Sequence, residues 1–202
     1  SEMCIRDRLT LRQLRRVLDE MTNLSDGARA EANRRLIDEL IPERVPMDLL
    51  LSVLRLLLEE RVSIRNMPVI LETIAEAKTA LPNAEAVCEY VRQRLGFQLV
   101  AELRRPDGTI PLVQLAPEWE QSFATYELGG TGGQVALPPD LFNRLANGIA
   151  EKLARAGETG VHAAVITSPL RRRFLRTVMI ARGLSAPVLS FDEIGFDARP
   201  SL

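Results

Sequence analysis

Histidine, cysteine and lysine are all scarce in this chain of 202 residues. His162 is the single histidine, Cys4 and Cys88 are the two cysteines, and Lys78 and Lys152 are the only lysines. Two cysteines provide neither a framework of several disulfides nor a thiol-based metal cluster. The formal net charge of −1 gives no general reason to expect nucleic acid or an anionic membrane as a partner.

Long apolar runs are missing as well. No stretch of about 18 apolar residues occurs, so the sequence predicts no membrane-spanning helix. The first eight residues, SEMCIRDR, resemble strings that arise at the ends of metagenomic translations when adapter bases are read as coding. We therefore exclude residues 1–8 from fold reasoning as a non-native tail, and on this interpretation the chain is a truncated piece of a longer protein.

Catalytic motifs are also missing. The sequence contains no G-x-S-x-G, no H-E-x-x-H and no Walker loop. His162 falls inside an apolar stretch, which favours a structural or surface role over catalysis, and the GGTGG segment at 129–133 is interpreted as a flexible linker. Glu118 and Glu120 flank Trp119 where a helix is expected to begin, and the helix dipole explains both carboxylates. We therefore predict that the chain is not an enzyme and has no cofactor and no metal.

The residues that are present predict helices throughout the first half. Thr10-Leu11-Arg12-Gln13 is a capping-box pattern, and Asn83 is expected to cap a later helix. The segment 47–60 is apolar around most of its circumference, which is typical of a buried helix. Cys88 is interpreted as a small buried hydrophobic residue. Four residues predicted for the core of this half are Leu54, Leu57, Ile70 and Ile74.

The segment VSIRN at 62–66 is predicted to be a tight corner between two helices. Pro68 is tolerated only in the first turn of a helix, because proline lacks an N–H. Asn66 is a favourable N-cap residue for that helix. Two interpretations remain open for Ser63, Arg65 and Asn66: a simple helix corner, or a surface used in subunit assembly.

The second half is expected to contain strands and helices. The turn signal Arg105-Pro106-Asp107-Gly108 separates it from the first half. A strand, a crossover helix and a second strand predict a right-handed βαβ unit. The expected strands are 110–115, 161–167 and 188–190, and the expected long helices are 138–155 and 168–182. The predicted fold class is therefore α+β with several subdomains: a helical subdomain followed by a small α/β subdomain.

An arginine-rich segment, SPLRRRFLR at 168–176, follows the predicted strand that ends at Thr167. A helix N-terminus beside arginines could bind a phosphate. However, no glycine is available for close backbone approach. A solvated basic face or a protein-docking face is therefore preferred, with Arg172, Arg173 and Arg176 as the candidate docking residues.

Taken in order, the segments ERVSIRNMPVILETIAEA, AVCEYVRQRLG, AVITSPLRRRFLRTVM and PVLSFDEI resemble the C-terminal cytoplasmic region of the FlhA family of flagellar and type III secretion export-gate proteins. The resemblance covers essentially all of residues 9–202. It implies that residues 9–44 are a helical lead-in, 45–104 a ring-forming helical subdomain and 105–202 a small α/β subdomain.

The resemblance also implies a function. Full-length members have transmembrane helices in the bacterial inner membrane, and their cytoplasmic half assembles into a nonameric ring beneath the export channel. Export substrates, their chaperones and other export-apparatus components are the implied partners. On this reading Ser63, Arg65 and Asn66 belong to the ring-forming module, and the fragment lies on the cytoplasmic side.

Three alternatives remain open from the sequence. The flagellar branch is the first choice over the virulence-injectisome branch, because the segment PLVQLAPEWEQSF resembles flagellar members more closely. A small-molecule or nucleotide-binding α/β domain would bind its ligand at the carboxyl ends of the strands, near Thr167, Ser168 and Ser190. An arginine-driven nucleic-acid module is disfavoured by the net charge of −1.

Overall fold

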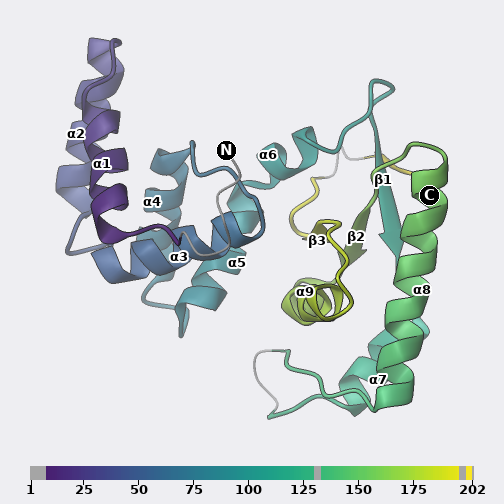
Figure 1. Ribbon diagram of the computed structural model, residues 1–202. Helices are drawn as coiled ribbons and strands as arrows, with labels where there is room; N and C mark the ends of the chain where they lie inside the picture. The colour runs from purple at the N-terminus through teal and green to yellow at the C-terminus, as the bar shows by residue number, and fades with distance from the viewer. Residues whose placement is uncertain (1–7, 130–132, 196–198, 202) are drawn as a thin grey trace. The chain divides into compact units, whose positions relative to one another are not determined.

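The computed structural model of the chain describes residues 8–129, 133–195 and 199–201 (Figure 1). Most of the excluded tail and the centre of the GGTGG segment therefore lie outside the described residues. The chain divides into two compact units, one up to Leu95 and one from Gly96 onward. We describe each unit by itself.

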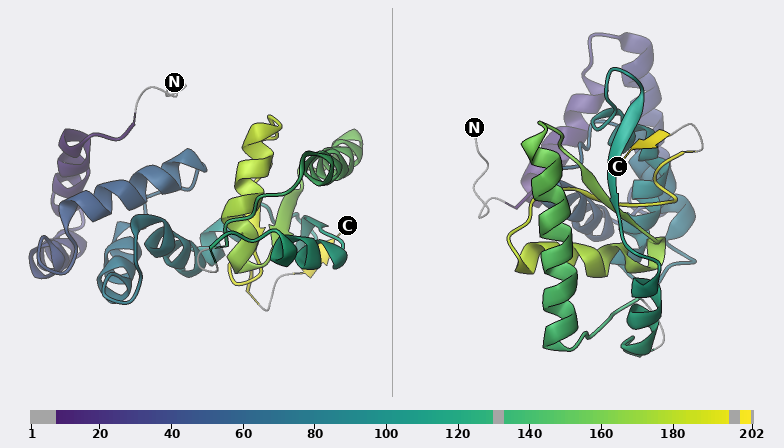
Figure 2. Two further views of the ribbon diagram at one scale, coloured as in Figure 1. Left: turned by 90° about the horizontal axis from the view of Figure 1, so that it is seen from below. Right: turned by 90° about the vertical axis from the view of Figure 1, so that its right-hand side faces the viewer.

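The first unit is helical. Its described residues form α1 (Leu11–Thr22), α2 (Gly27–Leu40), α3 (Met47–Glu59), α4 (Met67–Ala77) and α5 (Ala84–Arg94). Helices α1 and α2 pack side by side, α2 also contacts α4, and α5 packs against both α3 and α4 (Figures 1 and 2). The predicted helical half is therefore confirmed, and α3 ends one residue before the expected end.

Side-chain caps fix where several of these helices begin. Thr10 and Gln13 form the predicted capping box, in which each side chain accepts a hydrogen bond from the backbone N–H of the other. The Asn83 side chain accepts from the N–H of Ala86 at 2.9 Å, as predicted. The Asp26 side chain caps α2 in the same way. Each cap satisfies an N–H that has no partner inside its helix.

The core of the first unit contains the four predicted residues. Leu54, Leu57, Ile70 and Ile74 are each 0% exposed. Cys88 is 2% exposed, which confirms its interpretation as a small buried residue. The almost continuous apolar sequence of α3 is therefore explained by burial on several sides.

The second unit contains a parallel sheet. Its described elements are α6 (Gly96–Ala101), β1 (Thr109–Gln114), α7 (Glu118–Thr125), α8 (Pro139–Glu158), β2 (Ala164–Thr167), the 3-10 turn η1 (Pro169–Arg171), α9 (Arg172–Ala181), β3 (Val188–Ser190) and β4 (Arg199–Ser201). The described strands have the order β3-β2-β1-β4, and every neighbouring pair is parallel. The predicted βαβ unit, β2-α9-β3, is confirmed.

Helices α8 and α9 pack against the strands and against each other (Figure 2). Together they close a core that includes Phe123, Ile149, Val165, Leu175 and Met179. All four residues of β2 are buried, as expected for a central parallel strand. Because β1, β2 and β3 are parallel, their carboxyl ends all lie at one edge of the sheet.

The boundary between the units lies between Leu95 and Gly96 rather than between 104 and 105. Helix α6 therefore belongs to the second unit, where its first residue, Gly96, lies close to the backbone of Glu193. A Cβ atom at Gly96 would lie 2.2 Å from the carbonyl oxygen of Glu193, a distance that only glycine allows. The separation of residues 9–44 from the rest of the first unit stays a prediction.

The residues on either side of 130–132 pair with each other. The Leu128 N–H donates to the Gln134 carbonyl at 2.8 Å, and the Ala136 N–H donates to the Tyr126 carbonyl at 3.0 Å. Gly133 has φ +69°, and a Cβ there would lie 2.1 Å from the Leu170 carbonyl oxygen. The interpretation of a flexible linker is therefore wrong for Gly133, which is needed for close packing. Residues 130–132, for which the same flexible linker is predicted, lie outside the described residues.

Candidate docking and subunit-interface surfaces

The corner after α3 begins with a Schellman motif. The Val62 N–H donates to the Leu57 carbonyl at 2.9 Å, and the Arg61 N–H donates to that of Leu58 at 3.0 Å. Arg61 has φ 59°, the left-handed conformation that glycine usually adopts at this position. Val62 and Leu57 occupy the two positions whose side chains commonly contact each other in this motif, and both are buried. The sequence predicted the end of the helix but not the left-handed arginine.

The three candidate interface residues follow this motif. The Ser63 hydroxyl accepts from the Arg65 N–H at 3.3 Å, which stabilises a tight turn. Asn66 is the N-cap residue of α4 and Pro68 lies in its first turn, but the Asn66 side chain makes no capping hydrogen bond. The corner is therefore confirmed, whereas the predicted side-chain cap is wrong. The Arg65 side chain is exposed, and no ion pair to it is found among the described residues.

The arginine-rich segment does not form one solvated face. Arg172 is only 1% exposed. Its Nη1 donates to the Val188 carbonyl at 3.0 Å, and its Nε lies 3.8 Å from Oε2 of Glu193, whose side chain is 0% exposed. The Ser190 N–H donates to Oε1 of the same carboxylate. The assignment of Arg172 as a docking residue is therefore wrong: its guanidinium ties α9 to β3 and to the turn after it.

Arg171 is also buried, at 4% exposure. Its Nη1 lies 3.3 Å from a Glu127 oxygen, and its Nε lies 3.6 Å from Oε2 of Glu120. The Ser168 hydroxyl donates to Oε1 of Glu120 at 3.2 Å. The sequence explained Glu120 by the helix dipole alone. It did not predict the ion pair between Glu120 and Arg171, because these two residues lie in elements that are far apart in the sequence.

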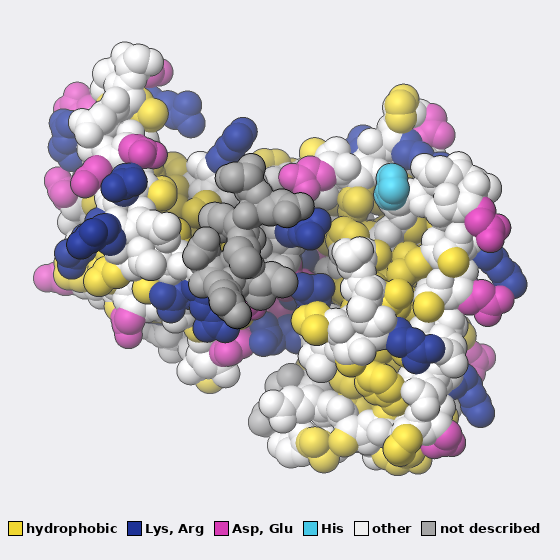
Figure 3. Space-filling model, in the orientation of Figure 1, with side chains coloured by type: hydrophobic (Ala, Val, Ile, Leu, Met, Phe, Trp, Pro, Cys, Tyr) yellow, Lys and Arg dark blue, Asp and Glu magenta, His cyan; other side chains and the backbone are white. Residues whose placement is uncertain are grey.

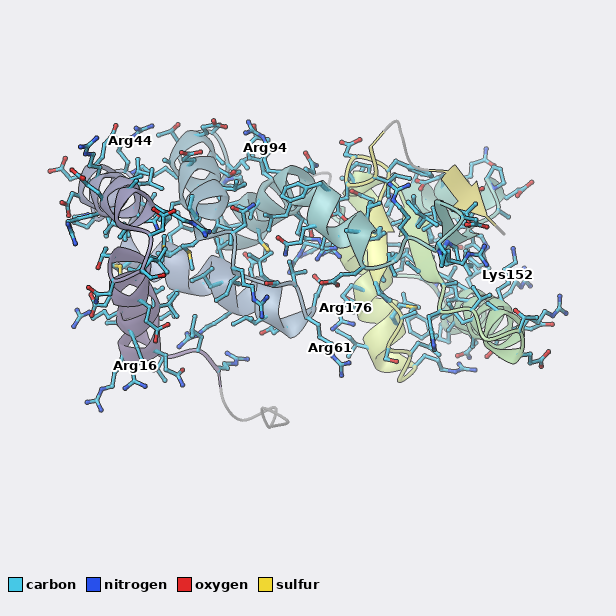
Figure 4. The ribbon with its side chains drawn as sticks, turned by 90° about the horizontal axis from the view of Figure 1, so that it is seen from above. Arg16, Arg44, Arg61, Arg94, Lys152 and Arg176 are labelled. Atoms are coloured by element: carbon cyan, nitrogen blue, oxygen red, sulfur yellow. The ribbon has the colours of Figure 1, made fainter. Side chains whose placement is uncertain are left out.

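Arg173 and Arg176 remain as candidates for docking. The Arg173 side chain on α9 is exposed. Arg176, on the same helix, has a partly exposed side chain (labelled in Figure 4). The exposed cationic surface that α9 offers is therefore narrower than the sequence predicted.

A second charged group lies on the surface of the first unit. Nη2 of Arg94 lies 2.8 Å from a Glu76 carboxylate oxygen and 3.1 Å from the Tyr90 hydroxyl, and the guanidinium lies over the Tyr90 ring (Figure 4). The hydrogen bond with Tyr90 and the charge of Glu76 raise the pKa of Arg94 above its ordinary value. This arginine therefore stays charged and joins α5 to α4.

A small pocket lies at the carboxyl ends of the parallel strands. Its volume is about 270 Å³. The chain segments that follow β1, β2 and β3 supply its walls, together with the start of α7. The lining residues are Gln114, Leu115, Ala116, Pro117, Trp119, Glu120, Ile166, Thr167, Ser168 and Phe191. This is the edge at which the sequence placed a ligand for the α/β-domain alternative.

His162 precedes β2 instead of lying within it, and its side chain is exposed (cyan in Figure 3). The expected strand thus begins three residues later than predicted. Within the described ranges, no group of three or more His, Cys, Asp or Glu side chains is arranged to hold a metal ion. None of the helices in the described part of the chain is long and apolar enough to span a bilayer.

Comparison with known proteins identifies the family. The model of the FHIPEP family matches residues 5–199, so the chain belongs to this family. It is 36% identical over 170 residues to the flagellar biosynthesis protein FlhA of Caulobacter vibrioides, an alignment that covers 84% of this chain and 24% of that protein. It is 29% identical over 196 residues to the hypersensitivity response secretion protein HrcV of Ralstonia nicotianae, covering 94% of this chain and 27% of that protein.

The fold is also found in a solved structure of this class. The nonameric EscV cytosolic domain from the type III secretion system superposes with a TM-score of 0.74 at 21% identity, over 96% of this chain and 55% of that chain. The chain thus has the fold of that cytosolic domain. It spans about a quarter of the length of the curated relatives that it matches.

Proposed function

We propose that this chain forms part of the cytoplasmic platform of a flagellar type III export gate, where it docks export substrates and chaperones beneath a membrane channel. The observation that carries the proposal is the match to the family model over residues 5–199, together with 36% identity to a flagellar FlhA. The full-length protein would be anchored in the bacterial inner membrane by a segment that precedes this region. The injectisome branch is the second candidate, favoured by the 29% identity to HrcV over 94% of the chain.

The test is an export assay in the host bacterium. The full-length gene is deleted and then restored with or without the region described here, and exported proteins are measured in the culture medium. Loss of flagellar proteins and of motility, recovered only with the complete gene, is the expected result. Normal motility with loss of secreted effector proteins would assign the chain to the injectisome branch, and unchanged export of both kinds would contradict the proposal.

Ring assembly is proposed for the first unit. The corner that contains Ser63, Arg65 and Asn66 presents two exposed arginines, Arg61 and Arg65, within a short and tightly hydrogen-bonded segment. The fork of N–H donors on a guanidinium is suited to a carboxylate of a neighbouring subunit. The solved EscV domain is nonameric, which supports a ring of the same kind here.

Docking of other export-apparatus components is proposed for the exposed side of α9. Arg173 and Arg176 would contact an acidic protein surface there, whereas buried Arg172 would not. R173E would reduce binding of such a component to the full-length protein without unfolding the second unit. Unchanged binding by R173E and by R176E would rule out this face.

A non-enzymatic role is part of the proposal, with no cofactor and no metal. Turnover of any substrate that is abolished by a single change at His162 or Ser168 would contradict it. The hydroxyl of Ser168 donates to the carboxylate of Glu120.

A further inference from the structure

Strand β3 is an edge strand of the sheet that the structure describes, so only one of its two sides has a neighbouring strand (Figure 1). The backbone N–H and C=O groups on the other side of an edge strand have no partner within the sheet. Such groups are a template on which a strand of another molecule can pair. What occupies the free side of β3 therefore decides whether this sheet can be extended by a second chain.

The hydrogen bonds between β3 and β2 show which residues of β3 face the free side. The Pro187 carbonyl accepts a hydrogen bond from a backbone N–H of β2 at 2.8 Å, and the Phe191 N–H donates to a carbonyl of β2 at 3.1 Å. Successive residues of a strand turn their N–H and C=O groups to opposite sides. Residues 187, 189 and 191 therefore face β2, whereas Val188 and Ser190 turn their backbone groups to the free side.

Two charged residues bind these outward-facing groups. Nη1 of Arg172 donates to the Val188 carbonyl at 3.0 Å. The Ser190 N–H donates to Oε1 of Glu193 at 3.1 Å, and the backbone N–H of Glu193 donates to the Ser190 carbonyl at 3.0 Å. Three backbone groups that a neighbouring strand would use are therefore already paired within this chain.

The two charged residues also hold each other in place. Nε of Arg172 lies 3.8 Å from Oε2 of Glu193, so one carboxylate oxygen faces the guanidinium while the other accepts from Ser190. Burial of two charges is costly, and apolar side chains of similar volume often stabilise a protein equally well or better. What the charged pair adds at this position is a donor for the Val188 carbonyl and an acceptor for the Ser190 N–H.

The sequence of β3 makes protection of this edge necessary. The segment 186–191, APVLSF, carries no charge that would repel a second copy of itself. We propose that Arg172 and Glu193 form an edge cap, a pair of side chains that prevents β3 from pairing with the β3 strand of a second copy of this chain. The proposal goes beyond the export role and does not depend on it.

Amide hydrogen exchange, followed residue by residue by NMR, tests the edge cap in the unmodified chain. The Leu189 N–H faces β2, whereas the Ser190 N–H faces the free side and is held only by Glu193. We expect the Ser190 N–H to exchange within about tenfold of the rate of Leu189, because a hydrogen bond to a carboxylate is at least as strong as one between backbone groups. Exchange of the Ser190 N–H at the rate of an unstructured peptide would overturn the proposal.

A double variant removes the cap while keeping the space filled. R172M/E193L replaces both charges by apolar side chains of similar size, a change that buried ion pairs commonly tolerate without unfolding. Circular dichroism checks the fold, and sedimentation velocity over a range of concentrations measures self-association. We expect the double variant to self-associate about tenfold more tightly than the unmodified chain, the factor that two additional backbone hydrogen bonds provide.

The control is L175A, which truncates a fully buried core residue of α9 and leaves the edge cap in place. This variant separates general loss of stability from exposure of the edge, and it is expected to self-associate like the unmodified chain. Equal self-association of R172M/E193L and L175A would contradict the edge cap. The exchange measurement on the unmodified chain needs no variant, so it tests the proposal even if R172M/E193L does not fold.

Amide exchange in R172M/E193L then locates the surface through which the copies associate. The Ser190 N–H is expected to exchange fast in dilute samples and to become protected as the concentration rises, because the β3 strand of a second copy then accepts its hydrogen bond. Self-association with fast exchange of the Ser190 N–H at every concentration would place the contact elsewhere and overturn the proposal. None of these results depends on export, so failure of this proposal and failure of the export role are distinguished.

Discussion

Arg172 and Glu193 form a buried ion pair in which Nε of the arginine lies 3.8 Å from Oε2 of the glutamate. Both side chains are almost completely enclosed, at 1% and 0% exposure. The pair explains why an arginine of the SPLRRR segment and the glutamate of FDEI occur together in this sequence. Its role is to hold the turn after β3 against α9, where that turn also receives the close contact of Gly96.

Breaking this pair is expected to destabilise the second unit strongly. E193Q leaves the guanidinium of Arg172 buried without its counter-charge, which costs about 3–5 kcal/mol in comparable buried pairs. Denaturant unfolding followed by the fluorescence of Trp119 measures the loss. R173Q, at the exposed neighbouring position, is the control and is expected to change stability by less than about 0.5 kcal/mol. A loss by E193Q no larger than that of R173Q would contradict the buried pair.

Truncation of Leu57 tests the core of the first unit. Leu57 is 0% exposed, and Leu57→Ala is expected to cost about 2–5 kcal/mol through lost burial and the cavity left behind. Leu11→Ala, at a position that is 40% exposed, is the control and is expected to cost less than about 1 kcal/mol. Unfolding followed by far-ultraviolet circular dichroism provides the measurement. Similar losses for the two variants would mean that α3 is not packed as described.

Two glycines of the second unit are expected to respond in opposite directions. Gly133→Ala introduces a Cβ 2.1 Å from the Leu170 carbonyl at a positive φ, and is expected to cost about 1–3 kcal/mol. Gly148→Ala lies within α8 with no atom near its added Cβ, and is expected to stabilise by about 0.5–1 kcal/mol. Thermal unfolding of the two variants checks both signs. A neutral Gly133→Ala would show that Gly133 does not pack against the Leu170 carbonyl.

Local signals in the sequence predicted most of the fold. The capping box at Thr10, the cap at Asn83 and the corner before Pro68 each depend on residues within a few positions of one another, so spacing alone is informative. The parallel pairing of β2 with β3 followed from the strand–helix–strand order of the predicted βαβ unit. These features were therefore accessible without any structure.

The surface residues were harder to predict because burial depends on distant partners. Arg172 was assigned to a docking face, but its partner Glu193 lies 21 residues away in the chain and no helical spacing relates the two. Glu120 was assigned to the helix dipole, although it pairs with Arg171 in another element. Arg65 is exposed, as a residue at a subunit interface would be in a single chain. Its contact with a neighbouring subunit stays a prediction.

The most direct measurement for the central claim is cross-linking of the full-length protein in its membrane, because a membrane-anchored segment raises the effective concentration of weak contacts. R65E is compared with R16E, which reverses the charge of an exposed arginine on α1 (Figure 4). If the corner is a subunit interface, R65E lowers the yield of high-order cross-linked oligomers and motility several-fold, R16E leaves both unchanged, and circular dichroism shows both chains folded. Normal oligomers and normal motility with R65E would contradict the assignment of this corner to the ring interface.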